Sequence, residues 1–388
     1  MASSDTPQSR LSTRLAFWVA GFAVSCWAPL VPFAKQRLAV DDSTLGLLLL
    51  CLGIGSVAAM LRTGPLCARY GCKPVIISGG MGLVVLLPAL AVVDTPLLLA
   101  LVLFGFGGAL GSLDVAMNVQ AVEVERDAKR PLMSGFHALF SVGGFAGAAL
   151  MTFLLSLSLS PLAGTLICST LMLVAMVVTA PRLLVTAKTS EGALLVIPRG
   201  PVLLIAALAA VMFLVEGALL DWSALLLTDT GLVGAAQAGI GYAVFSVAMT
   251  AGRFGGDAIT ARFGDLKVMV WGGLVGIGGF AVLLLAPHMG MAMAGFLLIG
   301  FGASNIVPVL FRRAGAQRAM PAALAIAAIT TTGYAGHLMG PATVGLVSKS
   351  VGLPGAFWVL AGLMCLVPVF AWTVTGEPAS DGVSVEVP

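Results

Sequence analysis

Long apolar runs, separated by short polar breaks, occupy almost the whole 388-residue chain. Each of twelve runs is long enough to form the helix of about 20 residues that crosses a bilayer. We predict these helices at residues 14–36, 44–66, 74–93, 96–121, 132–157, 161–181, 201–227, 234–258, 267–286, 290–311, 320–347 and 354–375. Only 10% of the residues are Asp, Glu, Lys or Arg, against about a quarter in soluble domains. The pattern predicts an all-α integral membrane protein and excludes a soluble globule.

Basic residues are distributed very unequally between the two sides of the predicted membrane. Seventeen of the 20 lysines and arginines fall on the side that carries both termini, and only Lys35, Arg37 and Lys349 fall on the other side. Loops rich in Lys and Arg stay in the cytoplasm. We therefore predict a multi-pass protein with both termini in the cytoplasm.

The longest polar break between apolar runs divides the chain into two halves of six runs each. We predict an N-terminal six-helix bundle at 1–181, a cytoplasmic linker at 182–200, a C-terminal six-helix bundle at 201–375 and a cytoplasmic tail at 376–388. Ala68-Arg69-Tyr70-Gly71 recurs 193 residues later as Ala261-Arg262-Phe263-Gly264. A repeat at half the chain length is typical of transporters with two pseudo-symmetric bundles around a midplane site.

The loop that contains this repeat carries a longer motif. Gly64-Pro65-Leu66-Cys67-Ala68-Arg69-Tyr70-Gly71-Cys72-Lys73 resembles the loop motif of the major facilitator superfamily, with Ala68 at the usual acid position and Cys72 at a usual basic position. The second copy, Gly252-Arg253-Phe254-Gly255-Gly256-Asp257, keeps an acid and can pair Arg253 with Asp257 on one helix face. The resemblance implies a cytoplasmic gate that clamps the bundles together. We assign Arg69, Arg253, Asp257 and Arg262 to it.

Polar side chains inside the apolar runs are few, and a charged one costs about 2.5 kcal/mol or more at the bilayer centre. Asp114 and Asn118 are four residues apart and share a helix face, whereas Glu216 and Asp221 are about 140° apart around theirs. Trp27 is a candidate aromatic platform for a sugar-like solute. We predict a substrate-binding or coupling role for eight residues: Asp114, Asn118, Glu216, Asp221, Asn305, His337, Tyr334 and Trp27.

Three longer strings resemble the MosC- and YbjJ-like group of bacterial inner-membrane proteins. They are Trp27-Ala28-Pro29-Leu30-Val31-Pro32-Phe33-Ala34-Lys35, the stretch from Ser112-Leu113-Asp114 to Glu125, and the stretch from Glu216-Gly217 to Asp221-Trp222. Asp114-Val115-Ala116-Met117-Asn118 is also similar to the fourth span of the fucose permease branch, where the acid takes part in proton-coupled sugar uptake. That branch carries a further acid in its first span, and Ser25-Cys26-Trp27-Ala28 has none. The resemblance implies an inner-membrane transporter and leaves proton coupling open.

We expect a secondary active transporter that moves a small polar solute, sugar- or cyclitol-like, by alternating access. Protonation of Asp114 or Glu216 is the option for proton coupling. Efflux of amphipathic compounds, or a non-transporting membrane receptor or assembly protein, are the alternatives. The sequence shows no nucleophile motif, phosphate loop or metal-ligand spacing, so we predict no enzyme, catalytic residue, metal or cofactor. The thinly spread net charge of +3 argues against nucleic-acid binding. The expected partners of this monomer are the solute, the proton and the lipid bilayer.

Overall fold

The computed structural model describes residues 6–40, 42–185, 198–232 and 239–376. The helices of the N-terminal half are α1 (Pro7–Trp27), η1 (Ala28–Leu30), α2 (Val31–Leu38), α3 (Asp42–Tyr70), α4 (Cys72–Val92), α5 (Pro96–Ala128), α6 (Met133–Ser156), α7 (Pro161–Thr179) and η2 (Ala180–Arg182). Those of the C-terminal half are α8 (Pro201–Asp229), α9 (Ile240–Leu284), α10 (Met289–Ala303), α11 (Ile306–Ala316), α12 (Ala322–Met364) and α13 (Leu366–Thr375). Within these ranges the chain is all-helical, as the apolar pattern predicts.

Eleven helical segments of the described chain are long and apolar enough to cross a membrane. One of them, α9, has 45 residues. A straight helix of that length would measure about 67 Å, twice the hydrocarbon thickness of a bilayer. Gly264 interrupts α9 with φ 79° and ψ 162°, so that α9 contains both the eighth and the ninth predicted segments. The twelve-helix membrane fold is thereby confirmed.

Helix α5 extends well beyond its predicted end. The sequence places that end at residue 121 because acidic and basic residues follow, whereas α5 continues to Ala128. Glu125 is only 5% exposed, because it lies in the contact between the two halves rather than in a solvated loop. Helix α9 is described from Ile240, and the predicted start of this segment at residue 234 lies outside the described ranges.

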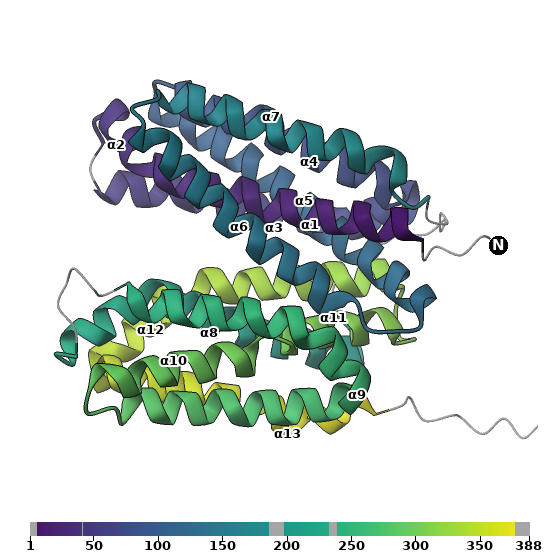
Figure 1. Ribbon diagram of the computed structural model, residues 1–388, viewed down its shortest axis with the longest axis vertical. Helices are drawn as coiled ribbons and strands as arrows, with labels where there is room; N and C mark the ends of the chain where they lie inside the picture. Colours follow the sequence, from purple (N-terminus) through teal and green to yellow (C-terminus); the bar gives the residue numbers. More distant parts are fainter. Residues whose placement is uncertain (1–5, 41, 186–197, 233–238, 377–388) are drawn as a thin grey trace, which may run out of the picture.

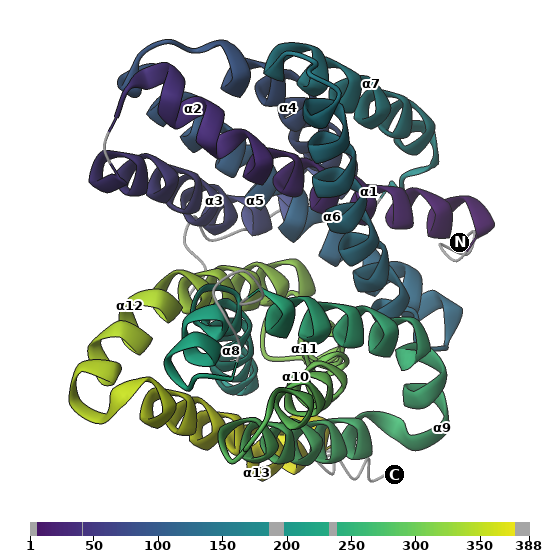
Figure 2. The ribbon, with the colours of Figure 1, turned by 60° about the vertical axis from the view of Figure 1, so that its left-hand side comes forward.

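The helices form two bundles, which Figure 1 shows one above the other and Figure 2 shows from a second direction. One bundle contains α1 to α7 and the other contains α8 to α13. The bundles meet chiefly through α3 against α12 and α6 against α9. The start of α1 and the end of α13 lie at the same end of the molecule (Figure 1), which we name the termini end. The domain limits at 181 and 201 stay predictions, since most of the linker lies outside the described ranges.

The predicted repeat has the same backbone geometry in both bundles. Gly71, before α4, has φ 83° and ψ 162°, and Gly264, within α9, has φ 79° and ψ 162°. Glycine adopts such positive φ values readily because it has no Cβ to clash. The matching angles, 193 positions apart in the sequence, relate the two bundles by pseudo-symmetry at this loop.

Helices α3 and α5 pack closely against each other in the stretch that precedes Asp114 on α5. A Cβ atom on Gly107 would overlap the backbone carbonyl of Leu52, and one on Gly111 would overlap the backbone of Ser56. The Ser56 hydroxyl donates a hydrogen bond to the Gly107 carbonyl at 2.9 Å. These glycines therefore admit a neighbouring helix rather than a ligand, and they fix α5 just before Asp114.

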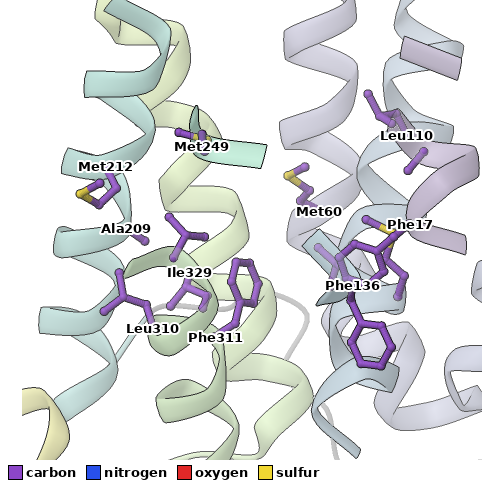
Figure 3. Close-up of a cluster of buried hydrophobic side chains, with 14 of the residues drawn as sticks. Phe17, Met60, Leu110, Phe136, Ala209, Met212, Met249, Leu310, Phe311 and Ile329 are labelled. Atoms are coloured by element: carbon purple, nitrogen blue, oxygen red, sulfur yellow. The ribbon is translucent and has the colours of Figure 1, made fainter. Parts of the chain in front are cut away.

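Figure 3 shows buried aromatic side chains of both bundles, with Phe17 and Phe136 on one side and Phe311 on the other. The rings of Phe17 and Phe136 stack with centroids 5.9 Å apart in the N-terminal bundle. His137 lies 5.2 Å from Phe17 and 5.5 Å from Phe311, which belongs to α11 of the other bundle. The imidazole of His137 thus connects the two apolar cores.

Candidate functional site

Asp114 and Asn118 lie buried on α5, with 8% and 0% of their surfaces exposed. The Asn118 side-chain amide donates to the Asp114 backbone carbonyl at 2.9 Å and reaches its carboxylate Oδ1 at 3.4 Å. These contacts confirm that the two residues share one helix face. The Asn118 Oδ1 atom is buried and has no hydrogen-bond partner among the described residues, so that it offers an acceptor to a further group.

Glu216 on α8 faces Arg253 on α9, within the C-terminal bundle. The Arg253 Nη2 atom lies 4.0 Å from Glu216 Oε1, and the side chains are 8% and 30% exposed. Arg253 also donates from Nη1 to the Ser141 hydroxyl at 2.9 Å and from Nε to the Ser304 carbonyl at 3.4 Å. Because Ser141 belongs to α6, Arg253 joins a carboxylate of one bundle to a helix of the other.

Tyr334 on α12 is within electrostatic reach of one acid from each bundle. The charges of Asp114 and Glu216 both act on the Tyr334 hydroxyl, although Asp114 belongs to the N-terminal bundle and Glu216 to the C-terminal one. The Tyr334 ring packs on Phe213 of α8, with centroids 6.0 Å apart. We name Asp114, Asn118, Glu216, Arg253 and Tyr334 the central polar cluster.

Asp221 and His337 extend this cluster along the C-terminal bundle. The two side chains interact electrostatically, and the His337 Nδ1 atom lies 3.4 Å from the Phe213 carbonyl oxygen. Tyr242 on α9, which the sequence did not single out, is within electrostatic reach of both Glu216 and Asp221. Glu216 and Asp221, which the sequence predicts on separate faces of one helix, are therefore both within electrostatic reach of the Tyr242 hydroxyl.

Trp27 and Asn305 make no described contact with the central polar cluster. Trp27 is 5% exposed in the apolar core, and its indole nitrogen has no hydrogen-bond partner among the described residues. The Asn305 side-chain amide donates to the Gly252 carbonyl at 3.1 Å and to the Ser304 hydroxyl at 2.9 Å. Asn305 thus fastens the break between α10 and α11 to α9.

Asp257 on α9 binds the first turn of α6 in the other bundle. Its Oδ1 accepts the backbone N–H of Ser134 and its Oδ2 accepts that of Gly135, each at 2.9 Å. A helix N-terminus carries unpaired N–H groups and the positive end of the helix dipole, and both favour an anion. Arg253, the pairing partner that the sequence suggests for Asp257, instead donates to Ser141. Both residues therefore cross to α6.

A second contact between the bundles, at the ends of α5 and α11, escaped the sequence reasoning. Arg312 on α11 pairs with Glu125 of the N-terminal bundle and with Asp265. Asp265 also accepts from Arg313 Nε at 2.7 Å. Glu125 Oε2 accepts the backbone N–H groups of Leu132 and Met133, each at 2.6 Å. We name Glu125, Asp265, Arg312 and Arg313 the interbundle ion cluster.

A signal for this cluster existed in the repeated loop. Asp265 directly follows the second copy, Ala261-Arg262-Phe263-Gly264. The predicted gate residues Arg69 and Arg262 are exposed, and each guanidinium lies over the next aromatic ring, Tyr70 at 5.2 Å and Phe263 at 5.4 Å. The arrangement is equivalent in both halves. The described ion pairs across the interface come from Arg312 rather than from these two arginines.

The family of the chain follows from comparison with known proteins. A model of the Major Facilitator Superfamily matches residues 14–322. The chain belongs to this superfamily. An uncharacterized MFS-type transporter of Yersinia pestis is 48% identical to this chain. The match covers 94% of this chain and 96% of the relative. This chain is also 27% identical to the membrane protein MosC of Rhizobium meliloti, over 93% and 90% of the two chains. The predicted MosC-like assignment is confirmed.

Solved structures agree with this superfamily membership. The transporter FucP in its outward conformation is similar with a TM-score of 0.80 at 15% identity, over 97% of this chain and 100% of FucP. The human organic anion transporter MFSD10 is similar with a TM-score of 0.73 at 16% identity, over 94% and 99% of the two chains. At such identities the likeness shows the fold alone.

Proposed function

We propose that this protein is a secondary active transporter of the bacterial inner membrane, which moves a small polar solute by alternating access. The observation that carries the proposal is the central polar cluster, in which Arg253 lies 4.0 Å from Glu216 and donates to Ser141 of the other bundle, while Asp114 and Asn118 share a buried helix face. Carboxylates, an amide and a phenol provide the acceptors and donors that a sugar- or cyclitol-like solute requires. A solute bound there would contact both bundles.

Alternating access requires a contact between the bundles that can break and form again. The contacts of Asp257 with α6 and of Arg312 with Glu125 consist of hydrogen bonds and ion pairs. Water can replace such partners when the termini end opens, whereas a continuous apolar interface would resist separation. The excess of basic residues on this side supports a cytoplasmic location of both termini. In this orientation the termini end, where these contacts join the two bundles, faces the cytoplasm.

Glu216 and Arg253 are the pair that we propose for proton coupling. Protonation of Glu216 would cancel its attraction to Arg253 across 4.0 Å and leave a buried guanidinium whose hydrogen-bond partners among the described residues, Ser141 and Ser304, are neutral. A buried charge without a counter-charge is unfavourable. Arg253 would then move, and its hydrogen bond to Ser141 of the other bundle would change. A proton taken up at the cluster would therefore alter the contact between the bundles.

Proteoliposomes test this function with purified protein and a panel of sugars, polyols and cyclitols. We expect counterflow of at least one solute, accompanied by a solute-driven pH change. Glu216→Gln is expected to abolish the pH change and to keep counterflow. Asp229→Asn, at an exposed position of α8, is the matched control. If Glu216→Gln leaves the pH change intact, the proposed coupling pair is wrong, and if Asp114→Asn leaves it intact as well, proton coupling through the central polar cluster is wrong. If no member of the panel shows counterflow, the proposed solute class is wrong.

A groove on the C-terminal bundle favours a second candidate, the efflux of amphipathic compounds. Its volume is about 560 Å³, and Phe263, Trp271 and Phe301 line it beside Lys267. Trp271 is 64% exposed, so that an apolar compound with an anionic group would find aromatic surface and a cation there. Susceptibility of a deletion strain to a panel of amphipathic drugs separates the two functions, since only efflux predicts increased sensitivity.

A further inference from the structure

A cavity of about 430 Å³ opens between the two bundles at the termini end. The end of α5 and the residues after it form one wall, and residues of α9 and α11 form the other. Five lining residues are basic and two are acidic. The basic ones are Arg126, Lys129 and Arg130 from the N-terminal bundle and Arg312 and Arg313 from the C-terminal bundle. The cavity thus carries a clear excess of positive charge.

The two carboxylates of the cavity lining are already engaged. Glu125 pairs with Arg312, and Asp265 pairs with Arg312 and Arg313. Among the described residues, the ion-pair partners of these carboxylates do not include Lys129 or Arg130, which are exposed residues of the cavity lining. Arg126 pairs with Glu123 on its own helix, and its side chain is still 61% exposed. Three cations of one wall thus face a recess whose acids are occupied.

A recess of this kind concentrates anions, because walls of low dielectric focus the field of the charges that line them. Guanidinium and ammonium groups in close proximity suit phosphate oxygens, which accept several charge-assisted hydrogen bonds at once. Such an anion would touch Arg130 of one bundle and Arg313 of the other only while the bundles are together. A ligand that binds one conformation alone stabilises that conformation.

We propose that this cavity binds a phosphate-bearing polyanion and that its binding holds the termini end closed. The phosphate group comes from one of two sources, the headgroup of an anionic lipid or a soluble phosphate compound. The site is distinct from the central polar cluster, and binding there can be tested without a transport assay. It makes the conformational equilibrium of the protein depend on the anions at this end.

The test uses the full chain in phosphatidylcholine nanodiscs, with and without phosphatidylglycerol, and with pyrophosphate as the soluble probe. Two readouts are taken, the midpoint of thermal unfolding and the hydrogen exchange of residues 132–136. The amides of this stretch donate to Glu125 and Asp257, so that their protection reports closure of the termini end. Sodium chloride at equal ionic strength controls for screening.

Lys129→Gln/Arg130→Gln removes two cations of the cavity and leaves the interbundle ion cluster unchanged. Arg14→Gln/Lys73→Gln removes the same charge near the termini end outside the cavity lining and is the matched control. We expect pyrophosphate or phosphatidylglycerol to raise the unfolding midpoint and the protection of 132–136 in the wild type and in the control. In the cavity variant, the pyrophosphate concentration for half effect should rise about tenfold or more, since two charge-assisted contacts are lost.

The arms distinguish the sources of the phosphate group. A response to pyrophosphate in pure phosphatidylcholine supports a soluble compound, and a response to phosphatidylglycerol alone supports a lipid headgroup. The proposal is overturned if neither probe exceeds sodium chloride, or if the cavity variant responds like the control. Should the double variant fail to fold, Arg130→Gln alone is compared with Arg14→Gln by the same criteria.

Discussion

The Oδ1 atom of Asp257 lies 2.9 Å from the backbone nitrogen of Ser134, and this hydrogen bond joins the C-terminal bundle to the start of a helix in the N-terminal bundle. The other carboxylate oxygen binds the next amide, that of Gly135. One side chain thereby satisfies two of the N–H groups that every helix start leaves unpaired. The same carboxylate therefore both joins the two bundles and completes the hydrogen bonding at the start of α6.

Asp257→Asn is expected to weaken closure of the termini end. Asparagine keeps one acceptor and loses the charge that the helix dipole favours, a change of about 1 to 2 kcal/mol. Hydrogen exchange of residues 132–136 should accelerate correspondingly, about fivefold to thirtyfold. The control is Asp229→Asn, which changes an exposed acid at the C-terminal end of α8. This variant should leave the hydrogen exchange of residues 132–136 unchanged. Equal exchange in both variants would contradict the role of Asp257.

Arg312→Gln is expected to destabilise the fold more than Arg313→Gln. Arg312 is 17% exposed and serves two carboxylates, whereas Arg313 is 27% exposed and serves one. Removing a cation from buried acids costs about 3 kcal/mol or more, and a partly exposed pair contributes about 1 kcal/mol or less. Thermal unfolding in detergent measures the difference.

Adding Glu125→Gln to the Arg312 variant tests the cause of that difference. The second change removes one of the carboxylates left without a partner and should recover part of the lost stability. If it lowers stability further, the loss in Arg312→Gln does not come from buried, unpaired acids.

Arg253→Lys is expected to slow transport about tenfold, which corresponds to about 1.4 kcal/mol. A lysine keeps the charge near Glu216, but a single ammonium group cannot reproduce the separate contacts of the guanidinium with Ser141 and Ser304. Counterflow in proteoliposomes provides the rate. Ser141→Ala removes one of these contacts only and should produce a smaller loss. A rate of Arg253→Lys equal to that of the wild type would show that the guanidinium geometry is not needed.

Gly107→Ala is expected to destabilise the protein by about 1 to 3 kcal/mol, because the added methyl group meets the backbone carbonyl of Leu52 and forces α3 and α5 apart. Gly278→Ala is the matched control. It lies within α9, and nothing would stand within 4 Å of its Cβ atom. Because alanine favours helix, this control should be neutral or slightly stabilising. Unfolding midpoints of the two variants should therefore move in different directions or by clearly different amounts.

The membrane-spanning helices were predictable from the sequence because lipid imposes a strong local rule. Every residue of a spanning helix must hydrogen-bond its backbone within the helix and present an apolar surface, and that rule leaves runs that can be counted. Asp114 and Asn118 were predictable for the same reason, since polar groups are conspicuous in apolar runs. Their shared face required only the helical period.

The interbundle ion cluster was not predictable in this way. Glu125 and Arg312 are 187 positions apart, and each stands in a polar stretch that reads as a solvated loop. Only the approach of α5 to α11 buries them and turns loop charges into partners. The contact of Asp257 with Ser134 and Gly135 escaped for a related reason, because its donors are backbone groups, which every residue possesses.

The sequence by itself determined the class of the molecule, an all-helical membrane protein of twice six spans, because hydrophobic length and the half-length repeat are local properties of the chain. Only the tertiary structure decided which polar residues meet. It brought Asp114 and Glu216 within electrostatic reach of Tyr334 and gave Arg253 a partner in each bundle. Such meetings depend on the packing of helices that are distant in sequence, and their energies arise only when burial removes water from the charges.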